Sequence, residues 1–229
     1  MTTLRLISSM ATKALLADLG ALYTAHVPSI HIQLESVGGV DAAHRVQAGE
    51  AFDGVVLASD AIDKLMASGH VLAGSRADLV RSGVAVAVPA GQPLPDISTE
   101  AALLAAVLAA PTLGYSTGPS GVQLAKQFEA WGIAEHIKDR IVQAKPGVPV
   151  GTLVAQGEVA LGFQQLSEMR GVPGITVVGG LPQAVEIITT FSGSVAATST
   201  QPEAVQALWA FWRSAACTAL KLQHGMQAA

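Results

Sequence analysis

Two apolar segments with the length and composition of strands, Gly83–Pro89 and Val185–Ala196, lie about 100 residues apart in the chain. The residues before, between and after them alternate short apolar runs with helical patterns. A chain that completes one α/β unit, builds a second and returns to the first forms two lobes. We therefore predict a first lobe of residues 1–82 and 197–229 and a second lobe of residues 83–196, with hinge crossings near 83–89 and 185–196.

The first lobe is predicted to alternate strands and helices. Apolar periodicity indicates the strands Leu4–Ser8, Ile30–Ser36 and Val55–Leu57 and the helices Ala11–His26, Val40–Gly49 and Ser59–Gly69. This order implies a parallel sheet that helices cover. In the second lobe we predict the strands Thr112–Tyr115, Val159–Phe163 and Ile175–Val178 and helices over Ser98–Ala110, from Gly118 to Trp131 and from Val148. A final helix is predicted over Pro202–Leu222, with Trp209 and Trp212 on its buried face.

Composition and motifs argue against several classes of function. Half of the residues are apolar and 13% are charged, which is ample for a core. The net charge of −4 gives no general attraction to nucleic acid or anionic membranes, so we expect neither as a partner. No apolar run reaches 18 residues, so we expect no direct insertion into a membrane. Cys217 is the single cysteine, the histidines lack zinc spacing and no nucleotide loop follows a strand. We expect no cofactor and no metal.

The compartment depends on the start of the chain. Met1-Thr2-Thr3 leads directly into the first predicted strand, without the basic and apolar regions typical of an export signal. We expect a cytoplasmic protein if Met1 is the native start, and a periplasmic one if a leader has been removed.

Four motifs follow one another in a fixed order: Ser8-Ser9, Ser36–Gly39, Gln47–Asp60 and Gly118–Gly121. Over nearly the whole chain they resemble the type II periplasmic solute-binding proteins and, within these, the molybdate-binding branch. The resemblance implies an α/β fold of two lobes, each a mixed, mostly parallel sheet flanked by helices, joined by two crossing strands. It also implies that a small anion binds between the lobes and, in an exported protein, that the partner is a membrane permease of the ABC type.

Two positions depart from the molybdate-binding pattern. Gln165 falls where those proteins usually carry a tyrosine, and Gly38-Gly39 where they carry a hydroxyl residue. A glutamine offers amide donors and a carbonyl acceptor, which suits a larger ligand of mixed polarity, such as an organic carboxylate. The aconitate isomerases, relatives without a transport role, look similar to the same fold.

The predicted site uses groups that bind anions at little organisational cost. The first N–H groups of a helix lack intrahelical partners, and the helix dipole is positive there. Because Pro149 has no N–H, a donor near it comes from Val148 or from later residues. Four predicted helix starts supply such groups: Ser8-Ser9, Gly38-Gly39, Ser120-Gly121 and Val148-Pro149. Each of them alone is an ordinary helix cap or turn. Arg76 alone is an ordinary surface arginine, although it could face a carboxylate. The predicted ligand-binding residues are Ser8, Ser9, Gly38, Gly39, Ser120, Gly121, Val148, Gln164, Gln165 and Arg76.

Two functions stay open. A solute-binding protein captures a small anion and closes by hinge bending, and we favour this over an enzyme. A cytoplasmic isomerase would instead move a proton beside a carboxylate. It needs a base, and His44, Glu168 and Lys13 are candidates of which none is singled out, so the catalytic residues are unknown. A nucleophile elbow at Ser116, within Gly114–Gly118, is weaker because Gly118-Pro119 delays the helix that must follow.

Overall fold

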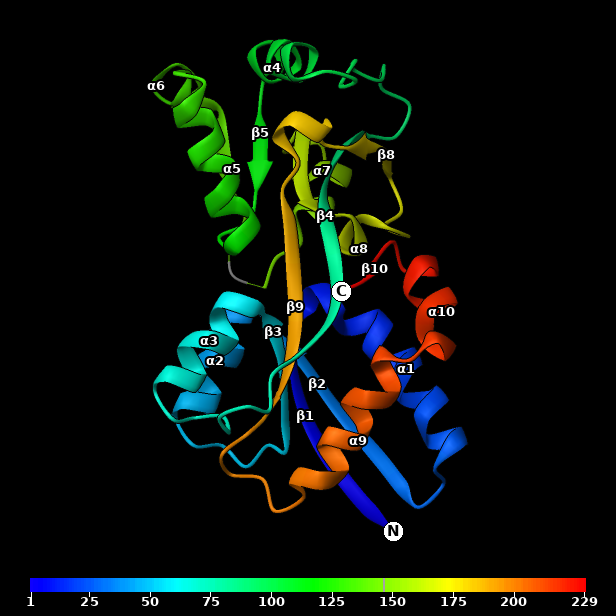
Figure 1. Cartoon of the computed structure of the whole chain (residues 1–229). Helices are drawn as coiled ribbons and strands as arrows, with labels where there is room; N and C mark the ends of the chain where they lie inside the picture. Colours follow the sequence, from blue (N-terminus) through cyan, green and yellow to red (C-terminus); the bar gives the residue numbers. More distant parts are fainter. Residues whose placement is uncertain (146) are drawn as a thin grey trace. The chain divides into compact units, whose positions relative to one another are not determined.

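The structure, a computed structural model, describes residues 1–145 and 147–229 (Figure 1). The chain forms two compact units, one of Met1–Ser82 with Thr190–Ala229 and one of Gly83–Thr189. Two strands, β4 (Ala77–Pro89) and β9 (Ile188–Val195), belong partly to each unit. Residues 190–196, placed in the second lobe from the sequence, are part of the first unit because β9 pairs with a strand there.

Strand β1 (Thr2–Ser9) organises the sheet of the first unit. It pairs in parallel with β2 (Ile30–Val37) and with β3 (Gly54–Ala58), as the strand–helix alternation predicts. Strand β9 adds antiparallel to β3, and β10 (Gln227–Ala228) pairs with β4. The helices are α1 (Lys13–His26), α2 (Gly39–Gln47), α3 (Ser59–Ala67), α9 (Pro202–Arg213) and α10 (Thr218–Gln223), with 3-10 turns at Met10–Thr12 and Ala215–Cys217.

Helices cover both faces of this sheet (Figure 1). Successive side chains of a strand point to opposite faces. Leu4 and Leu6 therefore pack with α1 and α9, whereas Ile7 packs with α2 and α3. The two faces form separate apolar clusters, and the second half of β1 is buried between them.

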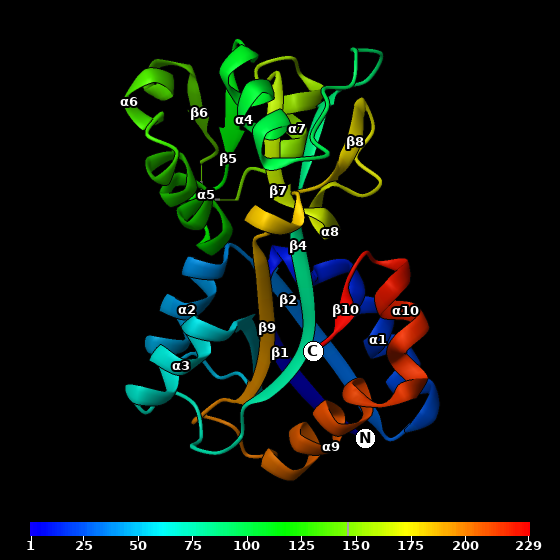
Figure 2. The ribbon, with the colours of Figure 1, turned by 45° about the horizontal axis from the view of Figure 1, so that its top comes forward.

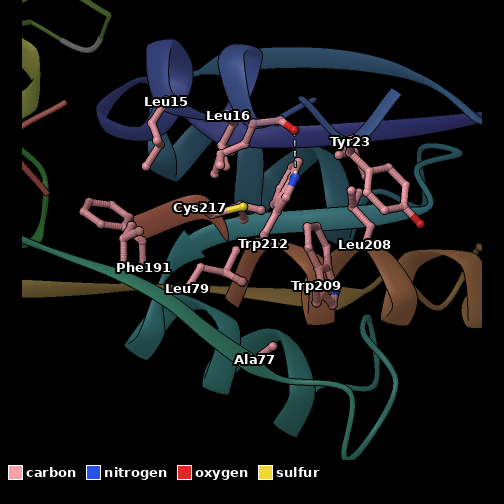
Figure 3. Packing of buried hydrophobic residues seen from close by; sticks show 14 of the residues in the cluster. Leu15, Leu16, Tyr23, Ala77, Leu79, Phe191, Leu208, Trp209, Trp212 and Cys217 are labelled. Carbon is pink, nitrogen blue, oxygen red and sulfur yellow. Dashed lines mark hydrogen bonds between the residues drawn. The ribbon is translucent and has the colours of Figure 1, made fainter. Parts of the chain in front are cut away.

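Two tryptophans of α9 fill the larger cluster, as the helical spacing predicts (Figure 3). The indole N–H of Trp212 donates to the Leu19 carbonyl at 3.2 Å. The single helix predicted over Pro202–Leu222 is wrong. Ser214 is extended, with φ −69° and ψ 160°, and this turn separates α9 from α10. The break lets Cys217 face the core, where it is fully buried.

The second unit has its own mixed sheet (Figure 2). Strand β4 pairs antiparallel with β7 (Leu161–Gln165) and β8 (Ile175–Gly180), and β5 (Leu113–Tyr115) pairs in parallel with β7 and with β6 (Ile141–Gln143). The helices are α4 (Glu100–Ala109), α5 (Pro119–Ala130), α6 (Ala134–Ile137), α7 (Val150–Ala155) and α8 (Leu166–Met169), with 3-10 turns at Lys138–Arg140 and Gln183–Val185. One apolar cluster joins β5 and β7 to α4 and α5. Gly162 lets α7 approach β7 closely, because an added Cβ would lie 2.4 Å from Val154.

We predict that Gly54→Ala destabilises the first unit. The added Cβ would lie 2.7 Å from Leu6 and 2.8 Å from Trp209, so a packed core must shift, at a cost of about 1–3 kcal/mol. The control is Gly20→Ala in α1, whose Cβ would come no closer than 3.7 Å to Ile32. That change should gain about 0.5–1 kcal/mol, since alanine favours helix. Urea unfolding followed by tryptophan fluorescence measures both, and equal stability of the two variants would contradict the packing argument.

Candidate functional site

Polar residues gather where β1 and β2 of the first unit end. The parallel register sets Ser8 opposite Ser36, and their hydroxyl oxygens are 2.8 Å apart. Ser9 follows at the end of β1, and α2 begins at Gly39 after its cap residue Gly38. A Cβ on Gly39 would lie 3.6 Å from the Ser9 Cβ, so these residues are neighbours. We call these five residues the first-unit cluster; they lie at the strand ends where α/β sheets usually bind ligands.

Ser9 is the least satisfied member of this cluster. Its side chain is buried, and within residues 1–145 and 147–229 its hydroxyl has no hydrogen-bond partner. Helix α2 starts without a side-chain cap, so its first-turn N–H groups keep their capacity to bind an anion. A hydroxyl donor beside a helix N-terminus is an arrangement that suits a carboxylate or oxyanion.

A second set of polar groups surrounds the end of β7, and we call it the second-unit cluster: Gly151, Gln164, Gln165, Glu168 and Thr189. Gln164 and Gln165 are the last two residues of the strand, not the residues after it, and each is 3% exposed. The Gln164 Oε1 accepts from the Gly151 N–H at 3.2 Å. The Gln165 Nε2 donates to the Thr189 hydroxyl at 2.7 Å.

Glu168 has an unusual proton affinity. Burial raises the pKa of its carboxyl from 4.5 to about 7, although the hydrogen bond from Gln164 acts in the opposite direction by favouring the charged form. The carboxyl can therefore gain or lose a proton near neutral pH. Among the three bases considered from the sequence, Glu168 is distinguished by this environment.

The start of α5 is built around a glycine. An added Cβ at Gly121 would lie 1.8 Å from the Ser116 carbonyl oxygen, so the turn after β5 can pack on the helix only when this residue is glycine. Ser120 in the first turn is buried. Two residues separate Ser116 from Pro119, where α5 begins, so the immediate strand-to-helix turn of a nucleophile elbow is not formed.

Two predicted residues occupy other surroundings. Arg76 forms ion pairs with Asp63 at 2.6 Å and Asp78 at 2.9 Å, so two carboxylates already balance its charge. The Val148 N–H donates to the Lys145 carbonyl at 3.0 Å, in the turn before α7. Their contact with a ligand stays a prediction, as does a cleft between the two units.

Sequence reasoning did not select Thr189 or Gly151. Thr189 lies 24 residues after Gln165, and only the chain's return in β9 brings it to the amide. Gly151 contributes a backbone N–H, and because nearly all residue types have one, the sequence does not indicate which N–H is used. Across the described residues, no group of three or more potential metal ligands occurs and no helix is long and apolar enough to cross a membrane.

These features define an α/β protein of two units, each with polar groups at the carboxyl ends of parallel strands, as in the two-lobed periplasmic binding proteins. The comparisons with known proteins agree. The chain belongs to the bacterial extracellular solute-binding protein family, whose sequence pattern matches residues 4–227. It is also 41% identical over 175 residues to an aconitate isomerase from Pseudomonas sp., a match that covers 72% of this chain and 63% of that protein.

Solved structures show the same fold. The periplasmic molybdate-binding protein of Azotobacter vinelandii superposes with a TM-score of 0.80 at 16% identity, covering 99% of each chain. The sulfate-binding protein SubI of Mycobacterium tuberculosis gives a TM-score of 0.80 at 16% identity, covering all of this chain and 87% of SubI. The type II binding-protein fold predicted from the motifs is thereby confirmed.

We predict that Glu168→Gln removes a pH dependence of stability. Between pH 4.5 and about 7, the folded state keeps a proton on Glu168 that the unfolded chain has lost. The free energy of unfolding of the wild type therefore falls as pH rises through this window, by about 3 kcal/mol relative to the glutamine variant.

Urea unfolding from pH 4 to 8 measures this difference. Glu158→Gln is the matched control, because Glu158 is exposed in the same unit. A constant difference between wild type and Glu168→Gln across the range would show that the carboxyl titrates normally.

Proposed function

We propose that this chain binds a small organic carboxylate. The observation that carries this proposal is the first-unit cluster: the Ser9 hydroxyl, which is buried and has no partner among the described residues, lies beside the start of α2, which has no side-chain cap there. Membership of the solute-binding family supports it, as do the sulfate and molybdate ligands named for the structures of the same fold.

Exposed apolar side chains favour an organic ligand. Val40 in the first turn of α2 is 53% exposed, and Val122 in the first turn of α5 is 51% exposed. Apolar side chains beside helix N-termini can contact a carbon skeleton while the N–H groups bind its carboxylate. An inorganic oxyanion makes no use of them. The amide of Gln165 adds a neutral group of mixed polarity.

As a solute-binding protein, the chain would deliver its ligand to a membrane permease. This partnership is part of the proposal and rests on family membership. A periplasmic location fits this role, as for the molybdate-binding protein from Azotobacter vinelandii.

Ser9→Ala should weaken carboxylate binding about tenfold, because a buried hydrogen bond to a charged group is lost. Isothermal titration with succinate, malate, citrate and tricarballylate measures the affinities, and a thermal-shift screen with the same acids should show a raised midpoint. Ser29→Ala is the control: Ser29 is exposed and lies just before β2, at the opposite edge of the same sheet. A response to molybdate or tungstate alone, with none to any carboxylate, would refute the proposal.

An isomerase is the second candidate, and two observations favour it. The aconitate isomerase from Pseudomonas sp. is 41% identical to this chain. The pKa of Glu168, raised to about 7, suits a group that removes a proton beside a carboxylate and returns it to another carbon. In this case the anion-binding groups would hold the substrate while Glu168 moves the proton, and a cytoplasmic location fits as well.

Incubation with cis- or trans-aconitate, followed by ultraviolet absorbance, tests this candidate. If the chain is an isomerase, the wild type changes the spectrum and Glu168→Gln slows the change at least 100-fold. Glu158→Gln should leave the rate unchanged. If the wild type binds a tricarboxylate without any spectral change, the chain is a binding protein and the isomerase candidate falls.

A further inference from the structure

We propose that the ligand carries a hydroxyl group, which donates a hydrogen bond to the Oε1 atom of Gln165. The inference rests on the proposed binding of an organic carboxylate and names its class, a hydroxycarboxylate. It depends only on residues of the second unit.

One hydrogen bond holds the Gln165 amide, and the strand pairing holds its backbone. The backbone of Gln165 pairs with Val84 of β4 at the end of β7. Its Nε2 donates to the hydroxyl of Thr189, at 2.7 Å, and Thr189 is itself buried. With the amide nitrogen held there, the carbonyl oxygen has a set direction. Over the described part of the chain, that oxygen is buried and accepts no hydrogen bond.

The neighbouring Gln164 is a useful comparison, because its side-chain carbonyl has a hydrogen-bond donor within the protein. Both glutamines are 3% exposed. The Gln164 Oε1 accepts from the Gly151 N–H at 3.2 Å, so its carbonyl is used within the protein. Gln165 has one partner and one open acceptor. An unpaired buried carbonyl is costly, and a ligand that donates a hydrogen bond to it would remove that cost.

The open group is an acceptor, which restricts the ligand. An ionised carboxylate or a fully ionised oxyanion offers only acceptors, so its oxygens would repel the Gln165 carbonyl. A hydroxyl on the carbon skeleton supplies the missing donor. A site built to bond a hydroxyl discriminates strongly against the analogue that lacks it, because the buried partner is then left unpaired.

Matched pairs of acids test the inference at about pH 8, where the carboxyl groups are ionised. Citrate and tricarballylate differ by one hydroxyl, as do malate and succinate. Isothermal titration of the full chain should show that the hydroxy acid of at least one pair binds tenfold or more tightly than its partner. In Gln165→Met this preference should fall below threefold. Gln183→Met, an exposed glutamine of the same unit, should keep the wild-type preference.

The outcomes separate this inference from the proposed function. If both members of each pair bind the wild type with equal affinity, or if Gln165→Met keeps the preference, the hydroxyl inference is overturned and carboxylate binding stands. If no carboxylate binds the wild type, both fail together. Circular dichroism of each variant confirms that it is folded, and should Gln165→Met fail to fold, the wild-type pairs alone decide.

Discussion

The pairing of β1 with two parallel neighbours is the constraint on which the first unit depends. Parallel strands end at one edge of a sheet, so the register that sets Leu4 and Leu6 in the core also carries Ser8 and Ser9 to that edge. The helix that returns from β2 must begin there, which brings its free N–H groups beside the two serines. The polar cluster is thus a consequence of the same strand pairing that buries the core.

Small residues decide how closely the remaining parts approach one another. Gly121 admits a backbone carbonyl against α5, because an added Cβ would lie 1.8 Å from the Ser116 oxygen. There the absent Cβ leaves room for a polar atom rather than for apolar packing. Gly162 has the other role, since it brings α7 against β7 and so places the Gly151 N–H within reach of Gln164. The second-unit cluster therefore depends on the packing of Gly162 against Val154.

Periodicity predicted most of the fold, because burial of apolar faces at spacings of two and 3.6 residues is a local property of the sequence. The break at Ser214 escaped it, since α9 and α10 both continue a helical pattern and the extended backbone of Ser214 is not marked by a glycine or proline. The serines and glutamines of the candidate site were predictable as strand-end residues. Thr189 was not, because its contact with Gln165 depends on where β9 returns. The ion pairs of Arg76 were hidden for the same reason: Asp63 lies on α3, and the sequence does not show which face meets the arginine.

The Glu168 carboxyl would act differently in a binding protein and in an isomerase. Near an anionic ligand, an ionised Glu168 would oppose binding, whereas the protonated carboxyl would offer a donor. Burial raises its pKa and so favours the protonated form, while the amide of Gln164 stabilises the charged form and holds the pKa near neutral rather than higher. Capture of an anion alone gains nothing from keeping this carboxyl close to the point of ionisation. A proton transfer does, because the group must both accept a proton and release it. An isomerase would use this carboxyl, whose pKa near 7 depends on burial and on Gln164.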